Sequence, residues 1–269
     1  MTMACPKLQV LIVTYGRRID AIDLAGLPIV GGVEYIVSCQ NPDRLDLDTS
    51  RFDGRDDIKV YFFADRGVSR NRNHCLDIAT ADYVQISDDD IAYNADALVK
   101  LIETFDADND IDIVTTRSVI PEHHEYPLDR HDLAKPWRFY SPIAFEIALR
   151  RSAVVKYHLR FAERISIGTD YITAGEENFF FLRCMRCGLY GVFRNITLSE
   201  HRGPTTCSHS AQQPGVVRAK GAILPCARGY FGGLIRLPVE AWRSQLPFFK
   251  ALTYLVQGYL YYLKYHKEL

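Results

Sequence analysis

The chain has 269 residues, 48% of them hydrophobic and 24% charged, and its formal net charge is −1 at pH 7. This length accommodates one large α/β domain or two small ones, and the composition is ordinary for a soluble globular protein. A charge near zero argues against a general nucleic-acid-binding protein. No apolar run reaches the roughly 18 residues of a membrane span, and residues 1–6 lack the basic region of a signal peptide, so we predict a cytoplasmic protein.

The first half of the chain alternates strands and helices. Continuous apolar runs predict strands at residues 8–15, 33–39, 58–63, 81–86 and 111–116. Apolar residues at helical spacing predict helices at residues 17–27, 68–79 and 94–105. This order favours an α/β fold with a Rossmann-like, mostly parallel central sheet flanked by helices.

The pattern is weaker in the second half. Strands are predicted at residues 143–149 and 190–193, and helices at residues 152–157 and 176–187. Residues 194–243 contain many Arg, Gly and Pro residues, and we predict a segment that covers the site or is mobile. Residues 246–263 predict an aromatic C-terminal helix, which either packs on the domain or lies on a membrane surface or a partner.

The seven cysteines are an odd number and are scattered, which indicates reduced thiols. Cys184 and Cys187 have the spacing of metal ligands, and His201, Cys207 and His209 follow them. A zinc site is therefore one alternative. We do not favour it, because the cysteine pair lies in an apolar run with helical character.

Three consecutive carboxylates, Asp88, Asp89 and Asp90, follow the strand predicted at residues 81–86. Open α/β sheets place their ligand crevice at this end of their strands. A divalent cation would relieve the repulsion among three adjacent charges, and carboxylate oxygens suit Mg²⁺ or Mn²⁺. The alternative is a solvated acidic turn that caps the following helix.

Several motifs occur in a fixed order around these acids. Thr14 and Tyr15 end the first strand, the run SRNRN at residues 69–73 opens a helix before the acids, and GEENF opens another helix about 85 residues after them. Their order and spacing resemble the family-2 nucleotide-sugar glycosyltransferases of GT-A fold, over roughly residues 8–200. The resemblance implies a GT-A domain at 1–200, with a nucleotide-sugar half at about 1–117 and an acceptor half at about 118–200. A C-terminal extension at 201–269, with a basic loop and an aromatic amphipathic helix, would follow it.

The resemblance also implies roles for matching residues. Asp88, Asp89 and Asp90 match the DxD motif, which bridges Mn²⁺ or Mg²⁺ to the donor diphosphate, with Asp90 and then Asp88 as the metal ligands. His201 is a further candidate ligand for the metal or the diphosphate, and His209 is its competitor. The residues implied to bind the nucleotide, besides Asp88 and Asp89, are Thr14, Tyr15, Gln40 (or Asn41), Arg70 and Asn73.

Glu176 and Glu177 match the acidic pair at the start of the family's acceptor-side helix. One of them would act as general base, taking the proton of the acceptor hydroxyl. The family usually has Asp at the second position, and we favour Glu177 over Glu176. The alternative is that both carboxylates simply stabilise a helix N-terminus. Arg218 and Lys220 either contact the diphosphate or an anionic acceptor, or are solvated charges.

The function implied by the resemblance is a metal-dependent inverting glycosyltransferase. It would move a sugar from a nucleotide donor, with UDP expected, to a saccharide or lipid-linked acceptor in cell-surface polysaccharide or lipopolysaccharide synthesis. We expect no nucleic-acid partner, and the C-terminal helix is the candidate for peripheral contact with the inner face of the membrane. The alternatives are a non-catalytic nucleotide-sugar-binding module and a nucleotidyltransferase, although residues 15–18 are too sparse in glycine for the phosphate loop of the latter.

Overall fold

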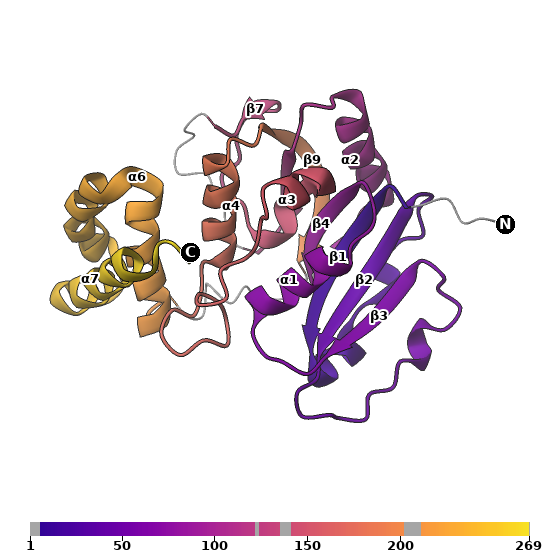
Figure 1. Cartoon of the computed structure of the whole chain (residues 1–269), viewed down its shortest axis with the longest axis horizontal. Helices are drawn as coiled ribbons and strands as arrows, with labels where there is room; N and C mark the ends of the chain where they lie inside the picture. The colour runs from indigo at the N-terminus through magenta and orange to yellow at the C-terminus, as the bar shows by residue number, and fades with distance from the viewer. Residues whose placement is uncertain (1–5, 122–123, 135–140, 202–210, 269) are drawn as a thin grey trace. The chain divides into compact units, whose positions relative to one another are not determined.

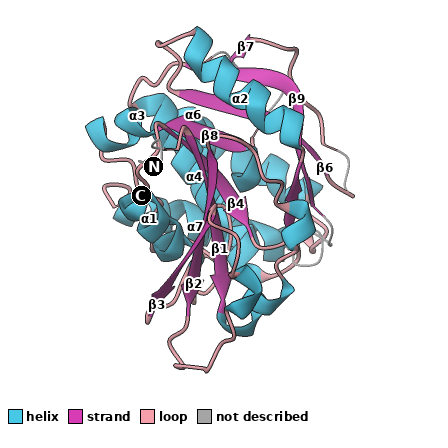
Figure 2. Ribbon diagram, turned by 90° about the vertical axis from the view of Figure 1, so that its right-hand side faces the viewer, coloured by secondary structure: helices cyan, strands magenta, loops and turns pink. Residues whose placement is uncertain are grey.

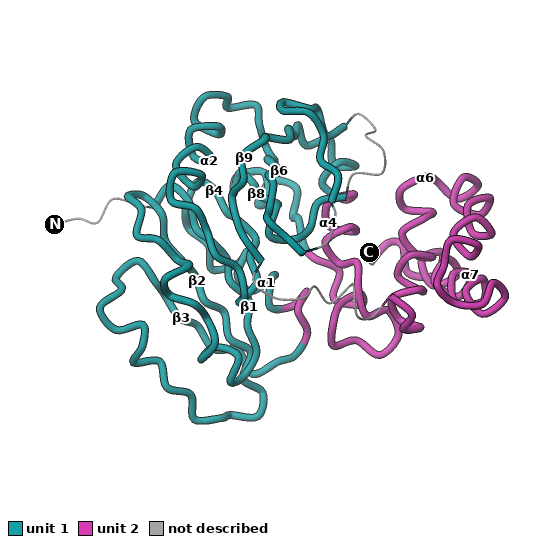
Figure 3. The backbone as a smooth tube through the Cα atoms, turned by 180° about the vertical axis from the view of Figure 1, so that it is seen from behind, with its two compact units in different colours: residues 1–66, 71–160, 184–203 teal, residues 67–70, 161–183, 204–269 magenta. Residues whose placement is uncertain are grey.

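The computed structural model describes residues 6–121, 124–134, 141–201 and 211–268, and Figures 1 and 2 show its helices and strands. The chain divides into two compact units (Figure 3). Unit 1 comprises residues 1–66, 71–160 and 184–203, and unit 2 comprises residues 67–70, 161–183 and 204–269. The C-terminal segment therefore groups with residues 161–183, a part of the chain that the sequence assigned to the acceptor half.

Unit 1 is built on a mixed β-sheet with the strand order β3-β2-β1-β4-β8-β6-β9-β5, and β7 pairs with β9. Strands β1 to β4 pair in parallel, whereas β8 runs antiparallel to both β4 and β6. The fold is α/β, as predicted, but the sheet is less parallel than the sequence indicated. The strands are β1 (Leu8–Tyr15), β2 (Val33–Gln40), β3 (Ile58–Phe63), β4 (Tyr83–Asp88), β5 (Ile91–Tyr93), β6 (Ile113–Val119), β7 (His131–Asp132), β8 (Ile147–Arg150) and β9 (Gly191–His201).

Helices cover this sheet, and their apolar faces make the core. They are α1 (Val68–Ile78), α2 (Ala95–Ala107) and α3 (Arg151–Lys156). Asn94 caps α2, because its side chain accepts a hydrogen bond from the amide of Ala97 at 2.9 Å. Leu98 and Leu101 of α2 are fully buried in one cluster with alternate residues of β1. Each buried leucine contributes about 1.5–3 kcal/mol, which fixes α2 to the sheet.

Residues 17–27 do not form the predicted helix. They form two 3₁₀ helices, Gly16–Ala21 and Leu24–Gly26. The side chain of Asp23 accepts a hydrogen bond from the amide of Ala25 at 3.0 Å and so starts the second helix separately. Short side-chain caps of this kind compete with a continuous helix.

Unit 2 contains the start of α4 (Glu176–Arg186) together with α6 (Pro214–Arg243) and α7 (Phe248–Tyr265). Residues 194–243 were predicted to cover the site or to be mobile, and their Gly and Pro content indicated little regular structure. Among the described residues, β9 continues to His201 and residues 214–243 are helical. The role of the glycines explains this difference. Gly221 of α6 and Gly258 of α7 lie against the backbone of the opposite helix, where a Cβ atom would not fit. The glycines therefore allow close helix packing instead of marking a loop.

Proline and glycine also shape α6 itself. Pro214 stands at the first position of the helix, where its missing N–H costs nothing. Gly229 has φ +72° and kinks the helix, so that residues 230–243 form a separate helical segment. Among the described residues, no helix is both long and apolar enough to cross a membrane.

Candidate functional site

The C-terminal ends of β1, β2 and β4 lie at one edge of the sheet of unit 1. In the parallel register, Tyr15 pairs with Gln40, and Val13 pairs with Asp88. The structure therefore brings Thr14, Tyr15, Gln40 and the acidic run together at the edge where α/β sheets bind ligands.

Asp89 is held by Thr14, near the end of β1, and by Arg18, which follows the strand. Its side chain is only 6% exposed. Thr14 donates from Oγ1 to Oδ2 of Asp89 at 2.6 Å, and Arg18 donates from Nε to the same oxygen at 2.9 Å and from Nη2 to Oδ1. The hydrogen bond to Asp89 raises the pKa of the Arg18 guanidinium. The two hydrogen bonds from Arg18 compensate the cost of burying the Asp89 charge, and they fix the position of this side chain.

Asp88 is held from the other side, by helix α1. The guanidinium of Arg72 lies 2.8 Å from Oδ1 of Asp88, and the Arg72 side chain is 5% exposed. The neighbouring Asn71 donates from Nδ2 to the carbonyl oxygens of Thr14 and Ser38, at 3.1 and 2.9 Å. Helix α1 is thereby anchored to the ends of β1 and β2, and this anchoring sets the position of Arg72.

Two other residues of α1 were predicted to bind the nucleotide. Asn73 is buried. Arg70 belongs to unit 2 and pairs with Glu163 of that unit at 3.0 Å, with about half of its side chain exposed. The basic residue of the SRNRN run that contacts the acids is therefore Arg72 and not Arg70. The nucleotide-binding role of Arg70 stays a prediction.

Asp90 has different surroundings. Its side chain is 42% exposed, and its Oδ2 lies 3.4 Å from Nε2 of His201 and 3.7 Å from Nη2 of Arg18. His201 is the last residue of β9 and pairs with Ile91 in the antiparallel β5–β9 ladder, which brings it beside Asp90. Burial raises the pKa of Asp90, and the charges of its two aspartate neighbours raise it further, whereas His201 and Arg18 oppose this.

These residues fit a hard divalent cation that shares its coordination with a substrate. No group of three or more His, Cys, Asp or Glu residues in the described ranges is arranged to hold a metal ion. Mg²⁺ and Mn²⁺, however, are commonly bound by one or two protein groups together with water and phosphate oxygens. Asp90 and His201 supply two such donors, with Asp88 beside them. A zinc cluster is not formed by Cys184 and Cys187, while Cys207 and His209 lie outside the described residues.

A polar cluster adjoins the end of β2. Nε2 of Gln40 donates to Oδ1 of Asp65 at 2.8 Å, and Nε2 of His74 lies 2.7 Å from Oδ2 of the same carboxylate. The His74 ring stacks on Phe63, with ring centroids 3.9 Å apart. The predicted base-reading residue, Gln40, therefore has its amide group committed to Asp65. Asp65 was not selected from the sequence, because the loop that carries it has no periodic pattern.

In unit 2, Glu176 and Glu177 form the first turn of α4. Glu176 is buried, and Glu177 is partly exposed and accepts a hydrogen bond from Nδ2 of Asn178 at 2.7 Å. Gly175, with φ +87°, lies directly before them and packs against Ile223 of α6. The helix start is thus fixed by packing within unit 2, and the choice between the two carboxylates as base stays a prediction.

Arg218 of α6 has structural partners within unit 2. Its Nε donates to Oε1 of Gln257 at 2.9 Å, and its guanidinium lies over the rings of Tyr171 and Tyr254, at 4.3 and 5.3 Å from their centroids. Lys220 is exposed. These contacts favour the structural alternative for Arg218 over a contact with diphosphate.

The decisive observation is a match of residues 46–162, which include the three aspartates, to the model of glycosyl transferase family 2. Residues 46–162 are therefore similar to the family 2 glycosyltransferases. This confirms the resemblance inferred from the motifs. No curated protein matches the chain.

Solved structures of S. aureus TarS are similar in fold. TarS 1–349 in complex with UDP-GlcNAc has a TM-score of 0.60 and 14% sequence identity, over 95% of this chain and 73% of that chain. The UDP complex of the same fragment has a TM-score of 0.59 and 13% identity, over 96% and 72%. For TarS itself, the TM-score is 0.58 and the identity 13%, over 96% of this chain and 44% of that one. The fold is therefore that of GT-A glycosyltransferases.

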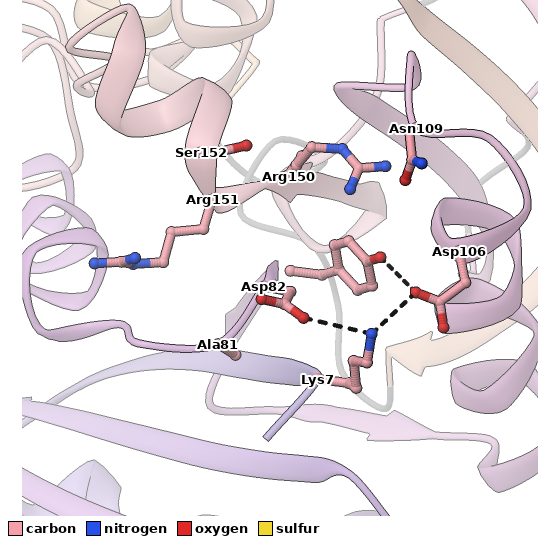
Figure 4. A pocket seen from close by; sticks show the side chains of 9 residues that line it. Lys7, Ala81, Asp82, Asp106, Asn109, Arg150, Arg151 and Ser152 are labelled. Carbon is pink, nitrogen blue, oxygen red and sulfur yellow. Dashed lines mark hydrogen bonds and ion pairs between the residues drawn. The ribbon is translucent and has the colours of Figure 1, made fainter. Parts of the chain in front are cut away.

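A second charged cluster surrounds the opposite end of β4 (Figure 4). Nζ of Lys7 lies 3.5 Å from Asp82 and 3.3 Å from Asp106, and the hydroxyl of Tyr83 donates to Asp106 at 2.6 Å. Arg150 lies over the Tyr83 ring, 5.2 Å from its centroid, and donates to three backbone carbonyls. The cluster lines a pocket of about 370 Å³.

Proposed function

We propose that this protein is a metal-dependent inverting glycosyltransferase that uses a UDP-sugar donor. Its acceptor would be a saccharide or a lipid-linked saccharide, in the synthesis of a cell-surface polysaccharide or lipopolysaccharide. The observation that carries the proposal is the arrangement of the three aspartates. Arg72 pairs with Asp88 and Arg18 with Asp89, while Asp90 lies beside His201. The match to family 2 and the similarity to TarS structures with UDP and UDP-GlcNAc support a nucleotide-sugar donor.

The charged residues at and around the end of β4 have distinct roles in this proposal. Asp90 and His201, with Asp88 beside them, would hold Mg²⁺ or Mn²⁺. The bound cation would supply Lewis-acid stabilisation of the charge that develops on the leaving diphosphate. Arg18 and Arg72 keep the neighbouring carboxylates in fixed positions, so that little reorganisation is needed when the donor binds.

The transfer itself needs a base on the acceptor side. The acceptor hydroxyl would attack the anomeric carbon as the bond to the UDP oxygen breaks, and Glu177 would take the hydroxyl proton. A single displacement of this kind inverts the configuration of the anomeric carbon. The support for Glu177 is the family resemblance and its partly exposed position in the first turn of α4.

The test is release of UDP from UDP-sugars, including UDP-GlcNAc, in the presence of Mn²⁺ and a panel of saccharide acceptors. We expect the wild type to release UDP and Glu177→Gln to be slower by about a hundredfold or more, because a positioned base contributes this much to a transfer. Glu103→Gln, at an exposed position of α2, is the matched control and should behave as wild type.

Two results would change the proposal. A protein that binds UDP but releases none from any donor with any acceptor would be a binding module and not an enzyme. If Glu176→Gln were inactive while Glu177→Gln kept full activity, the base would be Glu176.

A further inference from the structure

The distal part of α6, after the kink at Gly229, exposes large apolar side chains. Phe231 is 76% exposed and Trp242 is 81% exposed. Leu234 and Ile235 lie between them and are 51% and 61% exposed. Helical spacing places these side chains on one face of the helix, with residues 231, 235 and 242 in line and residue 234 beside them. This face is the most apolar part of the segment, yet it points to solvent.

A different face of the same segment packs against the rest of unit 2. Gly233, Leu237 and Ala241 are buried, and the last two belong to a cluster with Ala251 and Leu255 of α7. Amphipathic helices of soluble proteins normally bury their bulkiest apolar face. The distal part of α6 instead has two apolar faces. The face with the smaller side chains packs in the core, and the face with the larger side chains is exposed.

The turn between α6 and α7 extends this surface. The rings of Trp242 and Phe248 have centroids 6.5 Å apart, those of Phe248 and Phe249 are 5.3 Å apart, and Phe249 is 80% exposed. We define the aromatic patch as Phe231, Leu234, Ile235, Trp242 and Phe249. Large exposed apolar side chains that gather on one helix face and at the adjoining turn are typical of an interaction site.

Basic residues accompany the patch. Residues 214–268 contain eight Arg or Lys residues and two Glu residues, in a chain whose net charge is −1. Arg243 and Lys250 are exposed and directly follow Trp242 and Phe249 in the sequence. The partner of the patch should therefore combine an apolar layer with negative charge.

We propose that the aromatic patch docks on an anionic lipid surface. Tryptophan and phenylalanine insert at the boundary between headgroups and acyl chains, while lysine and arginine beside them attract anionic headgroups. A second copy of the chain suits the patch less well, because a symmetric interface would bring the Arg243 and Lys250 side chains of both copies to the same interface. The proposal does not depend on the reaction that the protein catalyses.

The docking surface differs from the one that the sequence indicated. Membrane contact was expected through the aromatic residues of the C-terminal helix. In the structure, Tyr259 and Tyr262 of α7 are 7% and 4% exposed and pack within unit 2. The contact surface instead combines the distal part of α6 with the first residues of α7.

The experiment is co-sedimentation of the full chain with vesicles. Phosphatidylcholine vesicles are compared with vesicles that contain about 30% phosphatidylglycerol. The variants are Phe231→Ser/Trp242→Ser, which removes two exposed aromatic rings, and Arg243→Gln/Lys250→Gln, which removes two charges. Ile29→Ser is the matched control, because Ile29 is 76% exposed but lies in unit 1. All substituted side chains are exposed, and circular dichroism checks that each variant is folded.

We expect the wild type to bind the anionic vesicles at least about tenfold more strongly than the neutral ones. The aromatic double variant should lose about tenfold or more in binding, and the charge variant about fivefold or more. Ile29→Ser should bind as wild type does. Equal binding to both vesicles, or equal losses in Ile29→Ser and the aromatic variant, would overturn the proposal. So would absent vesicle binding together with self-association that the aromatic variant abolishes, since the patch would then be a contact between copies.

Discussion

A cluster of charged side chains lies at each end of strand β4, and the two clusters differ in their balance of acidic and basic groups. At its start, Asp82 and Asp106 face Lys7, and Arg150 is bound to backbone carbonyls. At its end, about 20 Å away along six residues of strand, three consecutive carboxylates face two arginines and one histidine. Each end has cations and acids, but the balance between them differs.

This difference separates structural charge from functional charge. In the first cluster, the hydrogen bond from Tyr83 lowers the pKa of Asp106, and the cation Lys7 adds to this effect. In the second cluster, burial and the neighbouring aspartates raise the pKa of Asp90. A carboxylate that its own protein stabilises poorly is a candidate site for a bound cation. The contrast therefore supports the proposal that the active site lies at the end of β4.

The largest expected effect comes from removing the carboxylate of Asp90, whose charge burial and the neighbouring aspartates disfavour. Asp90→Asn should lower UDP release by about a hundredfold or more, because it removes a group that fixes charge stabilisation at the leaving group. The variant should fold as well as the wild type, since burial already disfavours the charge of Asp90. Asp82→Asn is the matched change at the other end of β4 and should keep full activity. Equal losses in both variants, measured in the same assay, would remove the functional distinction between the two ends.

An intermediate effect is expected from the arginines. Arg18→Met leaves the buried carboxylate of Asp89 without its two guanidinium bonds, which should cost about 1–3 kcal/mol of unfolding free energy and lower activity about tenfold or more. Arg150→Met removes bonds to the carbonyls of Phe105, Asp108 and Ile111, so stability should fall by a similar amount while the folded protein stays active. Denaturant unfolding and UDP release, measured on the same samples, separate the two outcomes. An Arg18→Met variant with full activity would show that the position of Asp89 does not matter for the reaction.

The smallest effect is expected for Asp106. Its pKa is lowered in the folded state, so its ionised form stabilises the protein above the ordinary carboxyl pKa of about 3.9, and this contribution is lost as the pH falls through the lowered value. Asp106→Asn should therefore cost less than about 1 kcal/mol at pH 7, because the side chain is partly exposed. Unfolding followed from pH 7 to about pH 2 should show a smaller loss in the variant than in the wild type. Asp110→Asn, at an exposed position in the loop after α2, is the control. A change in UDP release by Asp106→Asn would contradict the structural reading of this cluster.

Much of the parallel half of the sheet could be predicted, because its strands are continuous apolar runs. The bounds of β1 and β3 match the predicted ones, and α2 begins after the cap Asn94. The antiparallel half could not be predicted as well. β5 has three residues, too few for a periodic pattern, and β9 extends past the predicted Phe193 to His201 because it pairs with three other strands.

The acids of the site were visible in the sequence, but their partners were not. Three aspartates after an apolar strand point to the edge of a sheet without any structure. Which arginine meets which aspartate depends on the 3₁₀ helix after β1 and on the rotation of α1, and neither follows from local spacing. The sequence selected Arg70, whereas the structure places Arg72 on Asp88 and Arg18 on Asp89.

The central claim is that the end of β4 binds a nucleoside diphosphate through a divalent cation, whereas the start of the strand is structural. Calorimetric titration of UDP, with and without Mn²⁺, tests it on the wild type, Asp90→Asn and Asp82→Asn. We predict Mn²⁺-dependent binding by the wild type and Asp82→Asn, and a loss of the Mn²⁺ dependence in Asp90→Asn. Binding that is independent of Mn²⁺, or a loss in Asp82→Asn equal to that in Asp90→Asn, would contradict the account.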